Sequence, residues 1–199
     1  MSTNTLYRLC AGTGMYSAFQ LVCNVARRAG ALPDTALTRG VAPLSAIFGL
    51  LALTGLYLWQ RQETGRLGLV GYALNAVGLA GSVGIEYVLN YVFPYLGKRT
   101  VDMLVHGAAG TIFLITAVVF MLGALLFGMA TLRAGKFPAL SVPPYALGSI
   151  LLSLRNTLPE WAVTVGGILA ALAVTWLSVV LWTAVSREQA PDSVGATEK

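Results

Sequence analysis

The sequence predicts an all-α protein, a polytopic transmembrane helix bundle with about six spans. Apolar residues make up 56% of the 199 residues, whereas charged residues make up only 11%. A soluble domain carries about 25% charged residues, so a chain with this few charges would be poorly solvated in water. The charged residues also lie between long apolar stretches, where membrane proteins place their loop charges. Composition and spacing therefore predict the same fold class.

Six apolar windows approach or exceed the length of about 20 residues that a membrane helix needs. They cover residues 5–26, 41–60, 67–93, 103–132, 138–154 and 159–185. The fifth window is short and contains Pro143 and Pro144, which predicts either a kinked span or a re-entrant segment. The loops are too short to hold a further domain, so we expect one transmembrane domain over residues 1–187. Residues 188–199 are polar and are expected to form a disordered tail.

The first window is expected to be a retained helix rather than a cleaved signal peptide. Polar residues such as Gln20 interrupt it, and its arginine pair, Arg27 and Arg28, follows the apolar part instead of preceding it. Six spans place both termini on one side of the membrane. That side carries seven Lys and Arg residues and the other side six, so the positive-inside rule predicts cytoplasmic termini.

Several functional classes receive no support from the sequence. The basic residues that produce a net charge of +5 are dispersed among the loops, so no nucleic-acid partner is expected. Cys10 and Cys23 lie thirteen residues apart in one window and cannot form a disulfide within a continuous helix. Ser82 lacks the first glycine of a Gly-x-Ser-x-Gly elbow, because position 80 is alanine. We therefore assign no catalytic residue and no cofactor, and an enzyme is not the favoured interpretation.

Glu86 is the residue that points most directly to a function. Counting back from Pro94 places it about 12 Å along the helix from the loop, inside the hydrocarbon layer. An ionisable group at that depth is costly and usually faces a partner or a water-filled cavity. If the third and fourth windows form an antiparallel hairpin about residue 98, Asn90 lies level with His106, and Asp102 lies near the boundary. These side chains would form a cluster of two carboxylates, an amide and the only histidine.

Further polar residues fall in the same half of the membrane as this cluster. Gln20 and Asn24 lie near the end of the first window, on the side to which Glu86 and His106 belong. The other half is mainly apolar. We therefore predict a polar vestibule open on the side opposite the termini, with the ligand-binding residues Glu86, Asn90, Asp102, His106, Gln20 and Asn24.

Three hypotheses account for this cluster. The favoured one is a vestibule that binds a small polar ligand or couples its passage to proton movement. A structural one treats the polar residues as helix contacts within a larger complex of membrane subunits in the lipid bilayer. The third is a metal-dependent intramembrane enzyme, because histidine and carboxylates suit zinc or a harder ion. The sequence has no His-Glu-x-x-His motif, so no metal ligand is assigned.

Two connections between windows carry a resemblance. The segments GALLFGMATLRAGKFP and YLWQRQETGRLGLVGYAL each join two apolar stretches through a short basic turn. They resemble connections in a family of uncharacterised small multi-pass membrane proteins of bacteria, over about a third of the chain. This resemblance implies a protein of the bacterial inner membrane, and it implies no activity and no functional residue. Six helices in 199 residues is also similar in size to the vitamin-capturing subunits of energy-coupling importers, a likeness of architecture alone.

Overall fold

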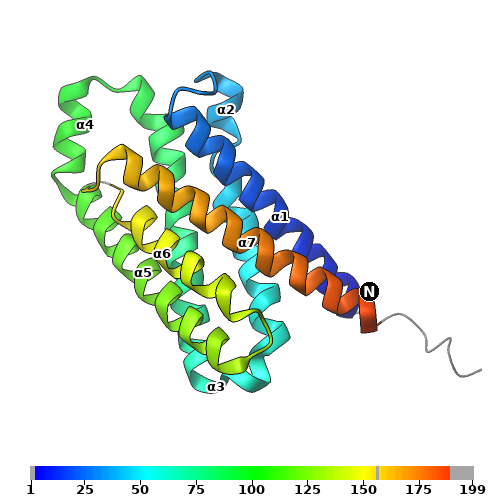
Figure 1. Cartoon of the computed structure of the whole chain (residues 1–199). Coiled ribbons are helices and arrows are strands. Elements are labelled where there is room, and N and C mark those ends of the chain that lie inside the picture. The colour runs from blue at the N-terminus through cyan, green and yellow to red at the C-terminus, as the bar shows by residue number, and fades with distance from the viewer. Residues whose placement is uncertain (1–2, 156, 189–199) are drawn as a thin grey trace, which may run out of the picture.

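A computed structural model describes residues 3–155 and 157–188, and every regular element in that part of the chain is helical. The long helices are α1 (Thr3–Arg28), α3 (Leu44–Tyr87), α5 (Ala108–Ala134) and α7 (Glu160–Glu188). The short ones are α2 (Ala36–Gly40), the π-helix η1 (Val88–Val92), the 3₁₀-helices η2 (Phe93–Tyr95) and η3 (Ala139–Ser141), α4 (Lys98–Val105) and α6 (Val142–Ser153). They form one helical bundle (Figure 1), so the predicted all-helical bundle is confirmed. Of the predicted tail, only Glu188 lies within the described residues.

Helix α3 folds back on itself at Gly65. This residue has φ 55° and ψ −146°, a left-handed conformation that glycine adopts without a steric penalty. Residues Thr54 and Tyr72 would lie about 27 Å apart along a straight helix. Their hydroxyl oxygens are instead 3.2 Å apart, and the rings of Tyr57 and Tyr72 stack at 4.4 Å. The two arms of α3, residues 44–64 and 66–87, therefore form an antiparallel hairpin over the predicted windows 41–60 and 67–93.

Three helical segments of the described chain are long and apolar enough to cross a membrane: Ala36–Tyr95, Ala108–Ala134 and Glu160–Glu188. This finding supports a membrane protein, with fewer qualifying segments than the six predicted windows. The first of the three contains both arms of α3. The window 103–132 is divided, because the helix breaks at His106 and Gly107 between α4 and α5. The window 138–154 contains a helix of only 12 residues, about 18 Å long, whereas the hydrocarbon layer is about 30 Å thick.

The second arm of α3 and helix α5 pack at backbone distance. A Cβ atom on Gly78 would lie 2.7 Å from the backbone nitrogen of Phe120, and one on Gly123 would lie 2.6 Å from the Cα of Asn75. Both glycines are needed because any side chain there would collide with backbone atoms. Small residues at membrane helix contacts allow this close approach, which increases van der Waals contact and stabilises the pair.

Helices α1 and α7 run side by side in opposite directions (Figure 1). Their contact is marked at one end by Arg8, whose Nη2 donates a 3.3 Å hydrogen bond to Ser186. The short helix α6 packs between α5 and α7. Gly148 of α6 again permits a close backbone approach, because a Cβ there would lie 2.6 Å from the nitrogen of Ala170.

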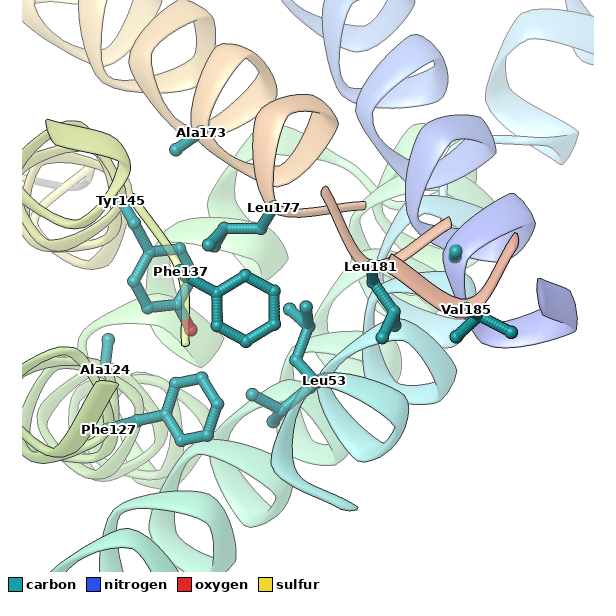
Figure 2. Close-up of a cluster of buried hydrophobic side chains, with 11 residues drawn as sticks. Leu53, Ala124, Phe127, Phe137, Tyr145, Ala173, Leu177, Leu181 and Val185 are labelled. Carbon is teal, nitrogen blue, oxygen red and sulfur yellow. The ribbon is translucent and has the colours of Figure 1, made fainter. Parts of the chain in front are cut away.

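The apolar core lies in the half of the bundle nearer the Gly65 turn and the described ends of the chain. Figure 2 shows Leu53, Phe137 and Leu177 pointing toward one another, with Phe127 and Tyr145 beside them. The side chains of these residues come from α3, α5, α6, α7 and the loop after α5. This half of the molecule is therefore stabilised mainly by apolar contacts, whereas polar residues gather at the opposite end.

The contact between α3 and α5 should be sensitive to a single methyl group. We expect Gly78→Ala to lower the free energy of unfolding by about 1–3 kcal/mol, because the added Cβ overlaps the backbone of Phe120. Gly84→Ala, in the same arm, is the matched control, since a Cβ there meets no atom within 4 Å. Thermal unfolding of the purified protein in detergent measures both changes. Equal effects of the two substitutions would contradict the close contact.

Candidate functional site

A cavity of about 650 Å³ is lined by residues from the end of α1, the end of α3 and the start of α7. Figure 1 shows these helix ends at the end of the bundle that carries α2 and α4. The cavity is bordered by α1, α3, η1, α7 and the loops after α1 and α6. We call it the vestibule. Its wall carries charges of both signs, from Arg27, Arg28, Arg39, Arg155, Asp34, Glu86 and Glu160.

An ion pair between Glu86 and Arg155 lies on the vestibule wall. Glu86 is near the end of α3, and Arg155 lies two residues after the end of α6. The Oε1 atom of Glu86 accepts a hydrogen bond from Nη1 of Arg155 at 2.5 Å, and the two side chains are 20% and 19% exposed. Removing either partner would leave a sheltered charge without its counterion, which costs far more than breaking an exposed pair.

Asn90 connects this ion pair to α1. It lies in the π-helix η1 and is buried, with an exposed fraction of 6%. Its Nδ2 donates to Oε2 of Glu86 at 3.1 Å and to the backbone oxygen of Glu86 at 2.8 Å. Its Oδ1 accepts a 2.9 Å hydrogen bond from Nη2 of Arg27. A π-helical turn inside a helix is uncommon and frequently marks a functional site, so its position beside Glu86 is informative.

Asp34, in the loop between α1 and α2, binds two arginines. Its Oδ1 accepts hydrogen bonds from Nη1 of Arg27 and Nε of Arg39, both at 2.9 Å. Its Oδ2 accepts a further one from Nη2 of Arg39 at 2.6 Å. The hydrogen bonds from Arg39 and Arg27 lower the pKa of Asp34 to about 2. Asp34 is therefore an anion at neutral pH.

These contacts form one continuous polar chain along the wall. It runs through Arg155, Glu86, Asn90, Arg27, Asp34 and Arg39. The chain joins the end of α6, the end of α3, η1, the end of α1 and α2. The vestibule is thus bordered by side chains whose positions depend on one another.

Of the six residues predicted for the site, Glu86, Asn90 and Asn24 line the vestibule. Gln20 does not line it. The side chain of Gln20 is buried on α1, where its Nε2 donates a 2.8 Å hydrogen bond to the hydroxyl oxygen of Tyr16 one turn earlier.

Asp102 and His106 lie away from the vestibule. Both are exposed, Asp102 on α4 and His106 immediately after it, and neither lines the cavity. Nδ1 of His106 lies 2.8 Å from the backbone oxygen of Asp102, so this contact is local to α4. The second arm of α3 does pair with α5 in an antiparallel hairpin. The chain, however, forms α4 before α5 begins, and residues 98–105 therefore belong to a separate helix.

The site predicted from the sequence did not include four residues of the polar chain: Arg27, Asp34, Arg39 and Arg155. A signal for Arg155 was present in the sequence. A carboxylate inside a membrane helix requires a cation, and Arg155 lies between the fifth and sixth windows, on the same predicted side as Glu86. Hydropathy alone does not distinguish Arg155 from the other arginines on that side as the partner of Glu86.

A second cavity of about 190 Å³ lies deeper in the bundle, and we call it the inner cavity. Its wall shares five residues with the vestibule: Leu21, Ser45, Glu86, Leu152 and Arg155. Most of the remaining wall is apolar, including Leu53, Phe113 and Phe120. Tyr145 also lines it, and the Tyr145 hydroxyl accepts a hydrogen bond from Nδ2 of the fully buried Asn75. The Glu86–Arg155 ion pair therefore lies where a polar and an apolar space meet.

Across residues 3–155 and 157–188, no three His, Cys, Asp or Glu side chains are close enough together to hold a metal ion. The metal-dependent hypothesis gains no support from this arrangement.

Comparisons with known proteins give no relative for this chain. No protein-family model, no curated protein and no solved structure matches it.

The ion pairs of Asp34 should hold the loop before α2 in place over a wide pH range. Because the pKa of Asp34 is lowered in the folded chain, its contribution is complete above its ordinary pKa of about 4 and is lost only as the pH falls through about 2. We expect Asp34→Asn to speed hydrogen exchange of the backbone amides in residues 29–40. The ratio of native to variant exchange should stay constant between about pH 5 and 8.

Hydrogen exchange followed by mass spectrometry, corrected for the intrinsic pH dependence, makes this measurement. Glu160→Gln is the control, because it removes another vestibule carboxylate and leaves the Asp34 pairs intact. A protection ratio that collapses between pH 8 and 5 would contradict the role given to Asp34.

Proposed function

We propose that this chain is a multi-pass protein of the bacterial inner membrane that binds a small polar ligand, specifically an anion, in the vestibule. The observation that carries the proposal is the sheltered ion pair of Glu86 and Arg155 on the wall of a cavity of about 650 Å³. Concave sites with a few convergent polar groups are the usual form of small-ligand sites.

An anionic ligand follows from the balance of hydrogen-bond donors and acceptors. Each arginine carries five N–H donors, and four arginines line the vestibule together with three carboxylates. Within the described residues, Arg155 uses only Nη1, so its other N–H donors have no acceptor there. A carboxylate or phosphate oxygen would satisfy such donors, and arginine is well suited to bind both groups.

The membrane topology that we propose has about six crossings. α1, the two arms of α3, α5, α6 and α7 follow one another in alternating directions, which would place Thr3 and Glu188 on one side. α6 has only 12 residues, and it packs between α5 and α7. The charge distribution favours cytoplasmic termini, in which case the vestibule opens away from the cytoplasm.

The structural hypothesis is the principal rival. It receives support from the exposed apolar side chains of α5, such as Ile112, Leu114 and Ile115, which could contact lipid or another membrane subunit. It gives no role to a charged cavity or to surplus arginine donors. Proton-coupled passage of the ligand would also require that the ligand first bind in the vestibule.

Two substitutions of the ion pair should change anion binding in opposite directions. Glu86→Gln removes the carboxylate that competes for Arg155, so we expect tighter binding of inorganic phosphate and of acetate. Arg155→Gln removes the donor, so we expect weaker binding. A hydrogen bond to a charged group contributes about 1.5–3 kcal/mol, which corresponds to about tenfold or more in affinity. Equilibrium dialysis with radiolabelled phosphate or acetate and the full chain in lipid nanodiscs measures these changes.

The double variant Glu86→Gln with Arg155→Gln is the control for folding, because it leaves no unpaired charge at the site. It should bind phosphate and acetate as weakly as Arg155→Gln alone. If Glu86 and Arg155 were only a structural contact, the single substitutions would not shift affinity in opposite directions. That result, or an absence of anion binding to the native chain, would favour the structural hypothesis.

The proposed orientation predicts which end of the bundle reagents can reach. In a chain whose Cys10 and Cys23 are replaced by Ser, Thr100→Cys at the vestibule end should react with a membrane-impermeant maleimide in intact bacterial cells. Gln62→Cys, near the Gly65 turn, should react only after permeabilisation. The reverse pattern would invert the orientation, and equal labelling of both in intact cells would contradict a multi-pass topology.

A further inference from the structure

The vestibule and the inner cavity are parts of one site with two chemical characters. They meet at Glu86 and Arg155, which belong to both walls. On the vestibule side lie arginines and carboxylates, and on the inner side lie mostly aliphatic and aromatic residues. A ligand bound at Arg155 therefore faces water and charge on one side and an apolar space on the other.

The polar residues of the inner cavity do not make its wall hydrophilic. Three of its serines already donate hydrogen bonds to backbone oxygens: Ser17 to Ser45 at 2.7 Å, Ser82 to Gly78 at 2.9 Å and Ser153 to Ser149 at 2.7 Å. Because these hydroxyl groups are satisfied, they exert little attraction on a water molecule or a polar ligand. The inner cavity is thus suited to an apolar group.

The size of the inner cavity sets the size of that group. An engineered apolar cavity of about 150 Å³ in another protein stays dry and binds benzene. The inner cavity, at about 190 Å³, is somewhat larger. Small side chains on its wall, among them Gly49, Ala52 and Ala117, leave the space unfilled. It can accept a single ring or a short alkyl chain.

From this arrangement we infer that the ligand is a small amphiphilic anion, with a carboxylate or phosphate head at Arg155 and a short apolar body in the inner cavity. This inference rests on the proposed function and deepens it, because it names the chemical class of the ligand. Arg155 orients the molecule, since a head held at the boundary directs the rest of the molecule inward. Burial of the apolar body then adds affinity that the head alone lacks.

The inference is tested with a series of straight-chain carboxylates from acetate to hexanoate. Each buried methylene should raise affinity about fourfold until the inner cavity is full. Competition against radiolabelled hexanoate, with the full chain in phosphatidylcholine nanodiscs, gives the affinities. Binding to empty nanodiscs is subtracted, because the longer acids also enter the bilayer.

Substitutions in the inner cavity should remove the dependence of affinity on the length of the carboxylate's alkyl chain. They should leave the binding of the carboxylate head unchanged. Ala117→Phe fills the cavity, and Ala117→Leu is a milder variant in case the larger one fails to fold. Both should bind acetate as the native chain does and hexanoate no more tightly than acetate. Val118→Phe is the matched control, because Val118 is adjacent on α5, is 40% exposed and does not line the cavity. The affinity of Val118→Phe for the carboxylates should depend on chain length as that of the native chain does.

The results separate this inference from the function on which it rests. If the native chain binds acetate and hexanoate equally, or if the Ala117 variants keep the dependence on chain length, the apolar subsite is wrong and anion binding stands. If no anion binds, both are wrong. Adding anionic phosphatidylglycerol to the nanodiscs distinguishes the source of the ligand: weaker hexanoate binding indicates a lipid that enters the site, and unchanged binding indicates a soluble amphiphile. Both of these outcomes agree with the inference.

Discussion

The carboxylate of Glu86 requires a counterion, because it lies in an apolar helix where a lone charge is costly. Arg155 supplies it from 69 residues farther along the chain, so α6 must end beside the end of α3. Asn90 then extends the contact to Arg27, and α1 is joined to the same point. Three distant parts of the sequence are thus held together at the vestibule end by polar contacts that begin at one side chain.

The other half of the bundle has a different physical basis. Gly78 and Gly123 allow the backbones of α3 and α5 to touch, and Phe127, Leu177 and their neighbours fill the core with apolar side chains. This packing needs no charge and no water. Toward the vestibule the facing residues include small ones, such as Gly49, Ala52 and Ala117, whose side chains do not fill the space between the helices. The inner cavity therefore lies between a close-packed half and a polar end.

A sheltered ion pair is weak evidence for a purely stabilising role, since the cost of desolvating two charges offsets much of their attraction, and an apolar pair often serves as well. The pair of Glu86 and Arg155 also does not stand alone. It lies between a cavity with surplus arginine donors and a cavity with an apolar wall. A helix contact would require neither space, whereas a site for an amphiphilic anion uses both. This is why binding is favoured over a structural role.

The sequence by itself determined the helical class of the fold and singled out Glu86, because hydropathy and the rise of a helix are local properties that can be read along the chain. It also indicated which end of the bundle is polar. Only the tertiary structure decided that Arg155 and Arg27, rather than His106, lie near Glu86, and that a break at Gly107 separates α4 from α5. Charge pairing depends on the rotation and register of helices relative to one another. Those follow from many packing contacts distributed over the whole bundle, and no local pattern contains them.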